Sequence, residues 1–565
     1  MNMPARNLIL LIFGTLIVFC SCKKGNKADL ILYNGTVYTV DESFSRTEAM
    51  AVKDGKILGL GSSEEILQKY DADEIVELNG NYVYPGLIDA HCHFLGYGNS
   101  LLHADLSGTT SFEEIIDILK KRQADFPSEW ILGRGWDQND WTIKEFPHRE
   151  QLDRAFPDKP VLLRRIDGHA AIANSEALRR AGIDKSKVVD GGSLITEKGE
   201  LTGVLVDNAI GLVGKIIPVP EKKDIINALL QGEANCFAVG LTSVHDAGLN
   251  CPTIELVDSL HKSGDLKMRI YAMLSPGKEN YEHYLFKGIY KTNRLNVRSI
   301  KLFADGALGS RGALLLEPYS DDPGNVGLAV SSIEYLRDQC ELAYQNAYQV
   351  NTHCIGDSAN RLVLGIYADI LKGENDLRWR IEHSQIIHPD DFSMFGDYSI
   401  IPSIQSTHAT SDMHWADERI GEDRLKGAYA YRQLMEENGW IPNGSDFPVE
   451  NINPIYGFYA LSIRKDLSGY PENGFQAGNG LSREDALKAM TIWAAKSAFE
   501  ENEKGSLEPG KMADFIITER DLLTMPEEDI PATVIYQTWL AGENVYSSNK
   551  SHERKKLNNA SNPGQ

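Results

Sequence analysis

Cysteine is scarce in this chain: there are 7 among 565 residues, and no two form a Cys-x-x-Cys pair. The absence of such a pair argues against a thiolate zinc site. The cysteines beyond residue 22 are odd in number and scattered, which argues against a disulfide framework. Cys92 and Cys354 each stand beside a histidine. Because adjacent side chains on a strand face opposite sides, we expect both thiols to pack as small apolar groups behind any site those histidines form.

Positive charge is also in deficit. Lys and Arg total 57 against 80 Asp and Glu, which gives a net charge of −23. This balance argues against nucleic acid and anionic lipid surfaces as main partners. The hydrophobic fraction of 42% and charged fraction of 24% are those of a globular chain, and the length predicts more than one domain.

Long hydrophobic runs are lacking except near the N-terminus. Residues 8–19 form an apolar run that is too short to span a bilayer, and it follows Arg6 and ends just before Cys22. The pattern over residues 1–22 resembles a bacterial lipoprotein signal, in which Cys22 is lipidated, with a tether at 23–28. It predicts a protein exported to the bacterial cell envelope that touches a membrane only through its lipid anchor. The alternatives are an ordinary secretory signal and an uncleaved anchor.

Both ends of the remaining chain have the pattern of β-structure. Within residues 29–85, Asn34-Gly35, Asp54-Gly55 and Asn79-Gly80 each separate two short runs rich in Val, Ile, Leu and Tyr, and they predict hairpins. Residues 501–548 contain further strand-like runs. We expect the two ends to form one composite β-sandwich, followed by a polar tail at 549–565.

The middle of the chain, residues 86–500, alternates short apolar runs with helical stretches. Eight runs are expected to be strands: one before His91, then 241–244, 268–273, 300–303, 350–352, 379–381, 400–404 and 441–444. From the second run onward their spacing, about 25 to 50 residues, is close to the roughly 30 expected for one βα unit. The alternation predicts the α/β class and a (β/α)8 TIM-type barrel.

One gap breaks this rhythm, because about 150 residues separate His91 from the second run. A large insertion at about 97–232, after barrel strand 1, is therefore required. Insertions at that point emerge at the C-terminal face of a barrel, where active sites lie. We expect it to act as a lid and specificity element; a peripheral structural subdomain is the alternative.

Polar residues stand near the ends of several predicted barrel strands. His91 and His93 are two apart, so their imidazoles point the same way from one strand. Lys301, His353, His383 and Asp446 come near the ends of later strands. Alone, each histidine is an ordinary core residue and the aspartate a helix cap, but a lysine in an apolar strand must be neutralised or modified. Because barrel strands deliver these ends to one mouth, the set predicts a metal site.

The order His-x-His, Lys, His, His, Asp resembles the metal-dependent amidohydrolase superfamily. Within it, the chain is similar to the amidohydrolase-3 branch, which includes N-substituted formamide deformylases. The similarity extends to Lys301-Leu-Phe-Ala-Asp-Gly-Ala-Leu-Gly-Ser-Arg311, His408-Ala-Thr-Ser-Asp-Met413 and Gly505-Ser-Leu-Glu-Pro-Gly-Lys-Met-Ala-Asp514. It covers nearly the whole chain after the signal segment.

This resemblance implies a ligand set. His91 and His93 would hold one divalent metal with Asp446, and His353 and His383 would hold a second. Lys301 would be carboxylated and bridge the two metals. Zinc is the expected metal, although iron or manganese suits the same ligands, and one or two metals per chain remain open.

The resemblance also implies an activity: hydrolysis of a non-peptide carbon–nitrogen bond in a small N-acyl or N-formyl amide. A metal-bound hydroxide would attack, and the catalytic residue Asp446 would serve as general base and acid. The alternatives are a deaminase or cyclic-amide hydrolase on the same site, or a non-catalytic exported binding lipoprotein. The complete ligand set favours an enzyme, while the substrate and the oligomeric state stay open.

Six further residues are candidates for substrate binding. Four lie in the insertion, one follows the fourth barrel strand, and one follows the seventh. They are Trp136, Asp137, Arg165, His169, Arg311 and His408. Ordinary packing or a surface ion pair explains each of them equally well. Seven other histidines, including His103, are expected to lie outside the site.

Overall fold

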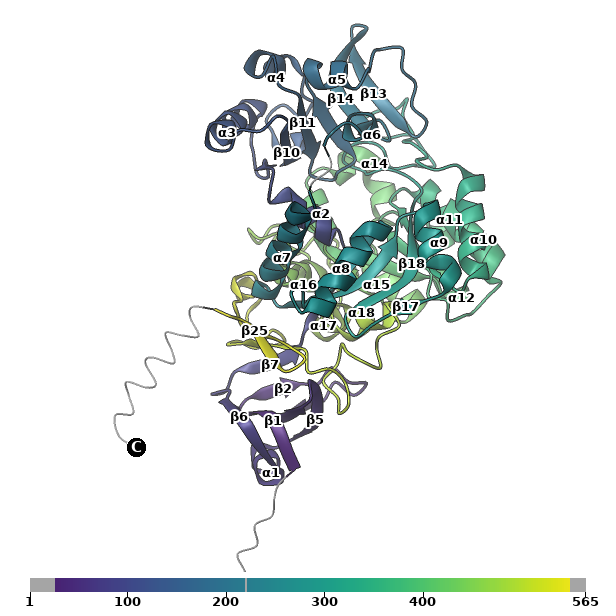
Figure 1. The fold of residues 1–565 in the computed structure, drawn as a ribbon. Coiled ribbons are helices and arrows are strands. Elements are labelled where there is room, and N and C mark those ends of the chain that lie inside the picture. The colour runs from purple at the N-terminus through teal and green to yellow at the C-terminus, as the bar shows by residue number, and fades with distance from the viewer. Residues whose placement is uncertain (1–25, 219–220, 549–565) are drawn as a thin grey trace, which may run out of the picture.

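The computed structural model describes residues 26–218 and 221–548 (Figure 1). A barrel occupies the middle, a β-sandwich built from both ends of the chain packs on one side of it, and the insertion covers the opposite side. The predicted α/β class and barrel are confirmed. The predicted lipidation site Cys22 and the polar tail lie outside the described residues, and residues 26–28, expected in the tether, begin the first strand. No helix in these two ranges has the length and hydropathy needed to cross a membrane.

Eight parallel strands form the barrel. They are β8 (Leu87–Cys92), β15 (Leu241–Leu249), β16 (Arg269–Leu274), β18 (Leu295–Phe303), β19 (Gln349–Cys354), β20 (Arg380–His383), β21 (Ile401–Gln405) and β22 (Asn443–Gly444). Each of the eight predicted runs supplies one strand. The last strand meets the first: the Asp446 N–H donates to His91 O (2.7 Å) and the His93 N–H donates to Phe447 O (2.8 Å).

A glycine permits this closure. A Cβ at Gly444 would lie 2.4 Å from the backbone nitrogen of His91, closer than real Cβ atoms approach. The end of β22 therefore runs directly against β8. This contact sets the spacing between the residues that follow each strand.

Helices cover the outside of the barrel, and capping residues define their ends. Before α8 (Cys251–Ser263), the Asn250 side chain accepts the N–H of Thr253, and the helix stops at Gly264 in a left-handed conformation. The Ser482 side chain accepts the N–H of Asp485 at the start of α17 (Arg483–Ala489), where the sequence predicts a helix start. Further helices on the barrel include α10 (Ile333–Gln345), α11 (Asp357–Leu371), α15 (Tyr431–Asn438), α16 (Pro454–Ile463) and α18 (Ile492–Ser497).

The sandwich contains two sheets. One runs in the order β5 (Lys56–Gly61), β4 (Ala49–Lys53), β1 (Asn26–Tyr33), β6 (Tyr70–Glu77). The other runs β25 (Glu543–Ser547), β24 (Ile535–Leu540), β23 (Phe515–Thr518), β7 (Tyr82–Pro85), β2 (Thr36–Tyr38), β3 (Arg46–Thr47). Because β7 pairs with β23, strands from both ends of the chain share one sheet, and apolar side chains from both sheets share one core.

Only one of the three predicted hairpins forms. Asp54-Gly55 joins the paired strands β4 and β5. Asn34-Gly35 and Asn79-Gly80 instead carry the chain from one sheet to the other, so those two predictions were wrong. Asn34 and Asn79 do adopt the left-handed conformation that such turns need, with φ of 61° and 52°. A local turn signal does not say which sheet the next strand will join.

The insertion builds a sheet of its own over the C-terminal ends of the barrel strands. It runs in the order β13 (Gly192–Glu197), β14 (Glu200–Asp207), β12 (Ala170–Ala173), β11 (Val161–Arg165), β10 (Ile131–Trp136), β9 (Ala104–Asp105). Helices α3 (Phe112–Asp125), α4 (Glu150–Ala155), α5 (Ser175–Arg180) and α6 (Ile210–Gly214) accompany it. The chain leaves the barrel through α2 (Phe94–Ser100) and returns through α7 (Lys222–Ala238), which packs against α2 and β15.

Candidate metal centre and its pocket

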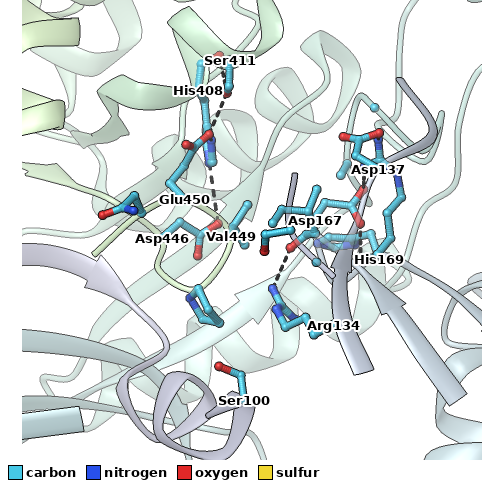
Figure 2. Close-up of a pocket in the computed structure, with 18 of the residues that line it drawn as sticks. Ser100, Arg134, Asp137, Asp167, His169, His408, Ser411, Asp446, Val449 and Glu450 are labelled. Atoms are coloured by element: carbon cyan, nitrogen blue, oxygen red, sulfur yellow. Dashed lines mark hydrogen bonds and ion pairs between the residues drawn. The ribbon is translucent and has the colours of Figure 1, made fainter. Parts of the chain in front are cut away.

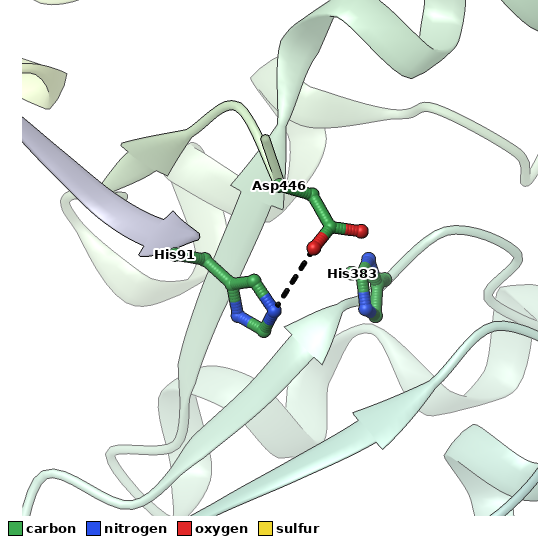
Figure 3. A group of neighbouring side chains, drawn as sticks. All are labelled: His91, His383 and Asp446. Carbon is green, nitrogen blue, oxygen red and sulfur yellow. Dashed lines mark ion pairs between the residues drawn. The ribbon is translucent and has the colours of Figure 1, made fainter. Parts of the chain in front are cut away.

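The two histidines of the His-x-His pair approach one carboxylate. His91 is fully buried near the end of β8, whereas about a third of the His93 side chain is exposed. Their Nε2 atoms lie 3.5 Å and 3.3 Å from Asp446 Oδ1. Figure 3 shows His91, His383 and Asp446 directed toward one another from separate elements. The ligand atoms of these three residues all lie within 4.8 Å of one another.

The other three predicted ligands adjoin this group. Lys301 is buried on β18, and its Nζ lies 3.1 Å from His91 Nε2. The ring of His383 is centred 4.5 Å from that of His353 and 5.0 Å from that of His91. All six residues that the sequence singled out as ligands are therefore brought to one place at the barrel mouth.

Two of the six residues have strained backbones. His383 and Asp446 adopt φ angles of 75° and 62°. Side chains other than glycine rarely occupy this left-handed region, and such residues cluster at functional sites. The Asp446 conformation is held by its N–H bond to His91 O. Figure 3 shows the side chains of His383 and Asp446 directed toward His91.

Charged residues that the sequence analysis did not single out support the ligands. Glu382 Oε2 accepts a hydrogen bond from His91 Nδ1 at 2.6 Å, which leaves Nε2 facing the site. Asp89 accepts the backbone N–H of His91 and the hydroxyl of Ser445 (2.6 Å), so it joins β8 to the segment that carries Asp446. The available signal was weak: Glu382 directly precedes His383 in the short and mostly polar strand β20.

The protonation states of the six residues suit a metal. Burial lowers the pKa of His91, His353, His383 and Lys301 below their ordinary values, which favours the neutral nitrogens that ligands need. Burial alone would raise the pKa of Asp446, but His408, His93 and His91 hold it well below its usual range. The site therefore offers neutral imidazoles beside a carboxylate.

Two ligand atoms are left without hydrogen bonds. His383 Nδ1 and Asp446 Oδ1 are buried and have no hydrogen-bond partner among the described residues. Such atoms are uncommon in folded proteins. A divalent cation would satisfy both, because nitrogen and carboxylate oxygen are the donors that zinc and similar ions take. The residues present thus fit the metal that the sequence predicts.

A pocket of about 760 Å³ opens above these ligands, between the barrel mouth and the insertion (Figure 2). His353, His383 and Asp446 form part of its lining. Among the predicted substrate-binding residues, Asp137, Arg165, His169 and His408 line it as well. His103, which the sequence analysis placed outside the site, also lines the pocket, because it lies between α2 and β9 at the start of the insertion.

Two predicted substrate-binding residues are not among the described residues that line the pocket, so these predictions are corrected. Trp136 is fully buried in the core of the insertion, where its indole N–H donates to Leu163 O (2.9 Å). Arg311 forms an ion pair with Asp321 (2.8 Å) in the loop after β18. Both fit the ordinary packing roles that the sequence left open for them.

Histidines stand on two sides of the pocket. Asp207 Oδ1 accepts a hydrogen bond from His169 Nδ1 (2.6 Å), and the His169 ring is centred 4.9 Å from that of His353. On the other side, His408 Nδ1 lies 3.1 Å from Glu450 Oε1 and Nε2 lies 3.7 Å from Asp446 Oδ2. Although burial opposes it, these two carboxylates raise the pKa of His408 to about 10.

The charge of Arg165 is already neutralised. Its guanidinium pairs with Asp137 and with Asp167 (2.7 Å), and its Nε donates to Gln138 (2.8 Å). Arg165 therefore joins the segment after β10 to its own segment at the end of β11. Its carboxylate partners leave little unpaired charge for a substrate.

A (β/α)8 barrel with histidine, lysine and aspartate ligands at its C-terminal mouth is the architecture of a metal-dependent hydrolase. Residues 74–546 match the model of the Amidohydrolase family, and the chain belongs to that family. The family and the fold predicted from the sequence are confirmed.

Known proteins resemble the chain over nearly its full length. Protein LONG AFTER FAR-RED 3 of Arabidopsis thaliana is 35% identical over 548 residues, 92% of each chain. The N-substituted formamide deformylase of Arthrobacter pascens is 24% identical over 545 residues, 91% of this chain and 97% of its own. The crystal structure of an uncharacterized metal-dependent hydrolase from Pyrococcus horikoshii OT3 matches with a TM-score of 0.72 at 30% identity, covering 88% of this chain and 99% of its own.

Proposed function

We propose that this chain hydrolyses non-peptide carbon–nitrogen bonds in small N-acyl or N-formyl amides. The observation that carries the proposal is the position of Asp446, which belongs to the ligand cluster and also lines the pocket. A group in both places can act on a substrate held in the pocket. The similarity to an N-substituted formamide deformylase supports an amide as the substrate class.

The metal of this proposal is a divalent ion, with zinc as the first choice. His91, His93, Lys301, His353, His383 and Asp446 would hold one or two such ions. When bound, the metal supplies Lewis-acid activation of water and of the substrate carbonyl. We further propose that Lys301 is carboxylated on Nζ, because burial disfavours its ammonium form and a carbamate offers anionic oxygen ligands.

Asp446 moves the proton in the proposed reaction. As a carboxylate it can take a proton from the attacking water and return it to the leaving nitrogen. Its Oδ1 faces His91 and His93, whereas Oδ2 faces His408. The His408 side chain, held between Glu450 and Asp446, keeps the carboxylate ionised and oriented.

His169 and His408 would orient the substrate from opposite sides of the pocket. Burial opposes it, but Asp207 raises the pKa of His169, and in the protonated ring Nδ1 donates to Asp207 while Nε2 is left to donate to a carbonyl oxygen. Asp137 and Arg165 fix the shape of the wall through their ion pair. The insertion covers the mouth and limits access of bulk water to the reacting atoms.

A hydrolysis panel with product identification tests the proposal. Purified metal-loaded protein would be given N-formyl and N-acetyl amines, adenine-type aminopurines and cyclic amides. Release of an amine together with formate or acetate is the expected result. Ammonia release would assign a deaminase and ring opening a cyclic-amide hydrolase. A fully metal-loaded protein that turned over none of these would support a binding protein instead.

We also propose that the chain is exported and anchored through a lipid on Cys22, a position outside the described residues. Expression in a bacterium fed labelled palmitate tests this. The wild type should carry label and sediment with membranes, and Cys22→Ser should do neither. Unlabelled wild type released from the membrane fraction would indicate an ordinary secretory signal.

A further inference from the structure

One side of the pocket, contributed by the insertion, holds arginines without acidic partners. Arg134 near the end of β10 and Arg122 in the last turn of α3 both line the pocket. Arg164 on β11 is the direct strand partner of Arg134. We refer to Arg122, Arg134 and Arg164 together as the arginine wall. Figure 2 shows Arg134 beside the same cavity as Asp446 and His169.

None of the three arginines forms an ion pair with a carboxylate in residues 26–218 and 221–548. Arg134 Nη2 donates to the backbone oxygen of Ile166 (2.7 Å), while its Nε is buried without a partner. Arg122 donates to the backbone oxygen of Leu102. The contrast is Arg165, one residue after Arg164, which is held by two aspartates. Unneutralised guanidinium groups are therefore specific to this part of the insertion.

Acidic residues lie near the arginine wall, but none forms an ion pair with it in the part of the chain that the structure describes. Asp105 on β9 is the strand partner of Arg134 on its other side, and it also lines the pocket. Its Oδ1 accepts the N–H of Ser107 (3.0 Å), and its carboxylate does not pair with Arg134. Asp446 and Asp167 also act on Arg134 through their charges and oppose the lowering of its pKa by burial, but neither forms an ion pair with it.

Repulsion between the three arginines lowers the stability of the fold unless an anion binds between them. Like charges placed directly opposite on neighbouring strands repel each other. Burial, and then Arg164, lower the pKa of Arg134 to about 10. Burial, followed by the charges of Arg122, Arg164 and Arg134, lowers the pKa of the adjacent His103 to about 4. His103 is therefore neutral at pH 7 and offers a hydrogen bond without adding charge.

We propose that the arginine wall binds a carboxylate on the substrate. This inference rests on the proposed function and narrows it: the substrates are N-acyl or N-formyl compounds whose other end carries a carboxylate. Guanidinium groups match carboxylates in shape and charge. Arg122, Arg134 and Asp446 line the same cavity, so one small molecule can present its amide to the ligand cluster and its carboxylate to Arg134.

Matched substrate pairs test the inference. Each pair is an N-formyl or N-acetyl amine that ends in a carboxylate or in the corresponding carboxamide, with spacers of different length, and release of formate or acetate is measured. The wild type should prefer the carboxylate by about tenfold or more in kcat/KM, mainly through KM. In Arg134→Gln the preference should fall to about twofold or less, mainly through a lower kcat/KM for the carboxylate.

Controls separate charge recognition from folding. Arg180→Gln removes another arginine of the insertion, one already paired with Glu176 and Glu129, and should keep the wild-type preference. Arg134→Lys, which keeps the positive charge, should retain part of the preference for the carboxylate. Equal kcat/KM for both members of every hydrolysed pair in the wild type would overturn the inference, as would a preference that survives Arg134→Gln.

A binding measurement keeps this test independent of catalysis. Ethanesulfonate, an anion that coordinates metals weakly, would be titrated into the metal-loaded protein by calorimetry. Binding by the wild type should weaken about tenfold or more in Arg134→Gln and not in Arg180→Gln. Anion binding that depends on Arg134, without any amide hydrolysis, would contradict the proposed function and still support anion binding by the arginine wall. Amide hydrolysis without anion binding or carboxylate preference would support the proposed function and contradict the role given to the arginine wall.

Discussion

Glu382 Oε2 lies 2.6 Å from His91 Nδ1, and both side chains are completely excluded from solvent. The contact fixes which ring nitrogen of His91 faces Lys301 and Asp446. A carboxylate behind a ligand histidine orients the ring and raises its basicity. This role explains why Glu382 is buried although it does not line the pocket.

Glu382→Gln should therefore weaken the metal site without unfolding the barrel. We expect metal affinity to fall about 10- to 100-fold, the usual cost of losing such a partner. Competition with a chelator followed by elemental analysis measures the change. Glu233→Gln is the matched control, because Glu233 is also largely buried but binds the backbone of Lys267 and Met268 instead. Equal metal affinity in the two variants would contradict the role given to Glu382.

Asp446→Asn should abolish turnover while preserving the fold. Asparagine tolerates the left-handed backbone at this position better than alanine does. Loss of a general base and acid lowers kcat by about 10²- to 10⁴-fold. The unfolding temperature should change by less than about 3 °C. A variant with near-normal kcat would rule out proton transfer by Asp446, and a large drop in the unfolding temperature would assign it a structural role.

The barrel and the sandwich are joined by a buried ion pair. At the start of β16, Arg269 Nε and Nη2 lie 2.7 Å and 3.0 Å from the carboxylate of Asp514, which precedes β23. Asp514→Ala leaves a buried guanidinium without its partner and should destabilise the protein by about 3–5 kcal/mol. Urea unfolding measures this. Asp529→Ala, which breaks the exposed pair with Arg520, should cost far less stability than Asp514→Ala.

His261 should make the protein sensitive to acid. Burial lowers the pKa of His261 to about 4, although its Nε2 bonds Met268 O at 2.9 Å. The unfolded chain binds this proton below a pH of about 6.5, so stability is complete above that pH and is lost as the pH falls toward 4. At pH 5 the loss is about 2 kcal/mol.

His261→Gln should flatten this dependence. Thermal midpoints of wild type and variant, compared at a pH of about 7.5 and about 5, measure the effect. The wild type should lose more on acidification than the variant does. Identical losses in both proteins would show that other groups carry the acid sensitivity.

The sequence predicted the barrel because short apolar runs alternate with helical stretches, the pattern expected of parallel strands covered by helices. It predicted the ligand positions because a histidine, lysine or aspartate lies within or just after several of these runs. Lys301 was conspicuous because it lies within an apolar run, whereas Glu382 lies in a short, mostly polar strand and gave a weaker signal.

What the sequence did not predict depends on long-range packing. Whether Asn34-Gly35 closes a hairpin depends on which sheet the next strand joins, and that strand pairs with β7, more than forty residues away in the chain. Trp136 and Arg311 looked like binding residues because they lie in polar segments near the site. Their partners, Leu163 and Asp321, are seen only once the fold is formed. The position of His103 in the pocket lining also depends on the folded insertion and is not apparent from the sequence.

The central claim is that distant parts of the chain form one metal centre. Elemental analysis of purified protein, wild type against Lys301→Ala, tests it most directly, with circular dichroism to confirm that both are folded. We predict one or two equivalents of a divalent metal in the wild type, and at least one equivalent fewer, with loss of amide hydrolysis, in the variant. A wild type without stoichiometric metal, or a variant that keeps its full metal and activity, would contradict the account.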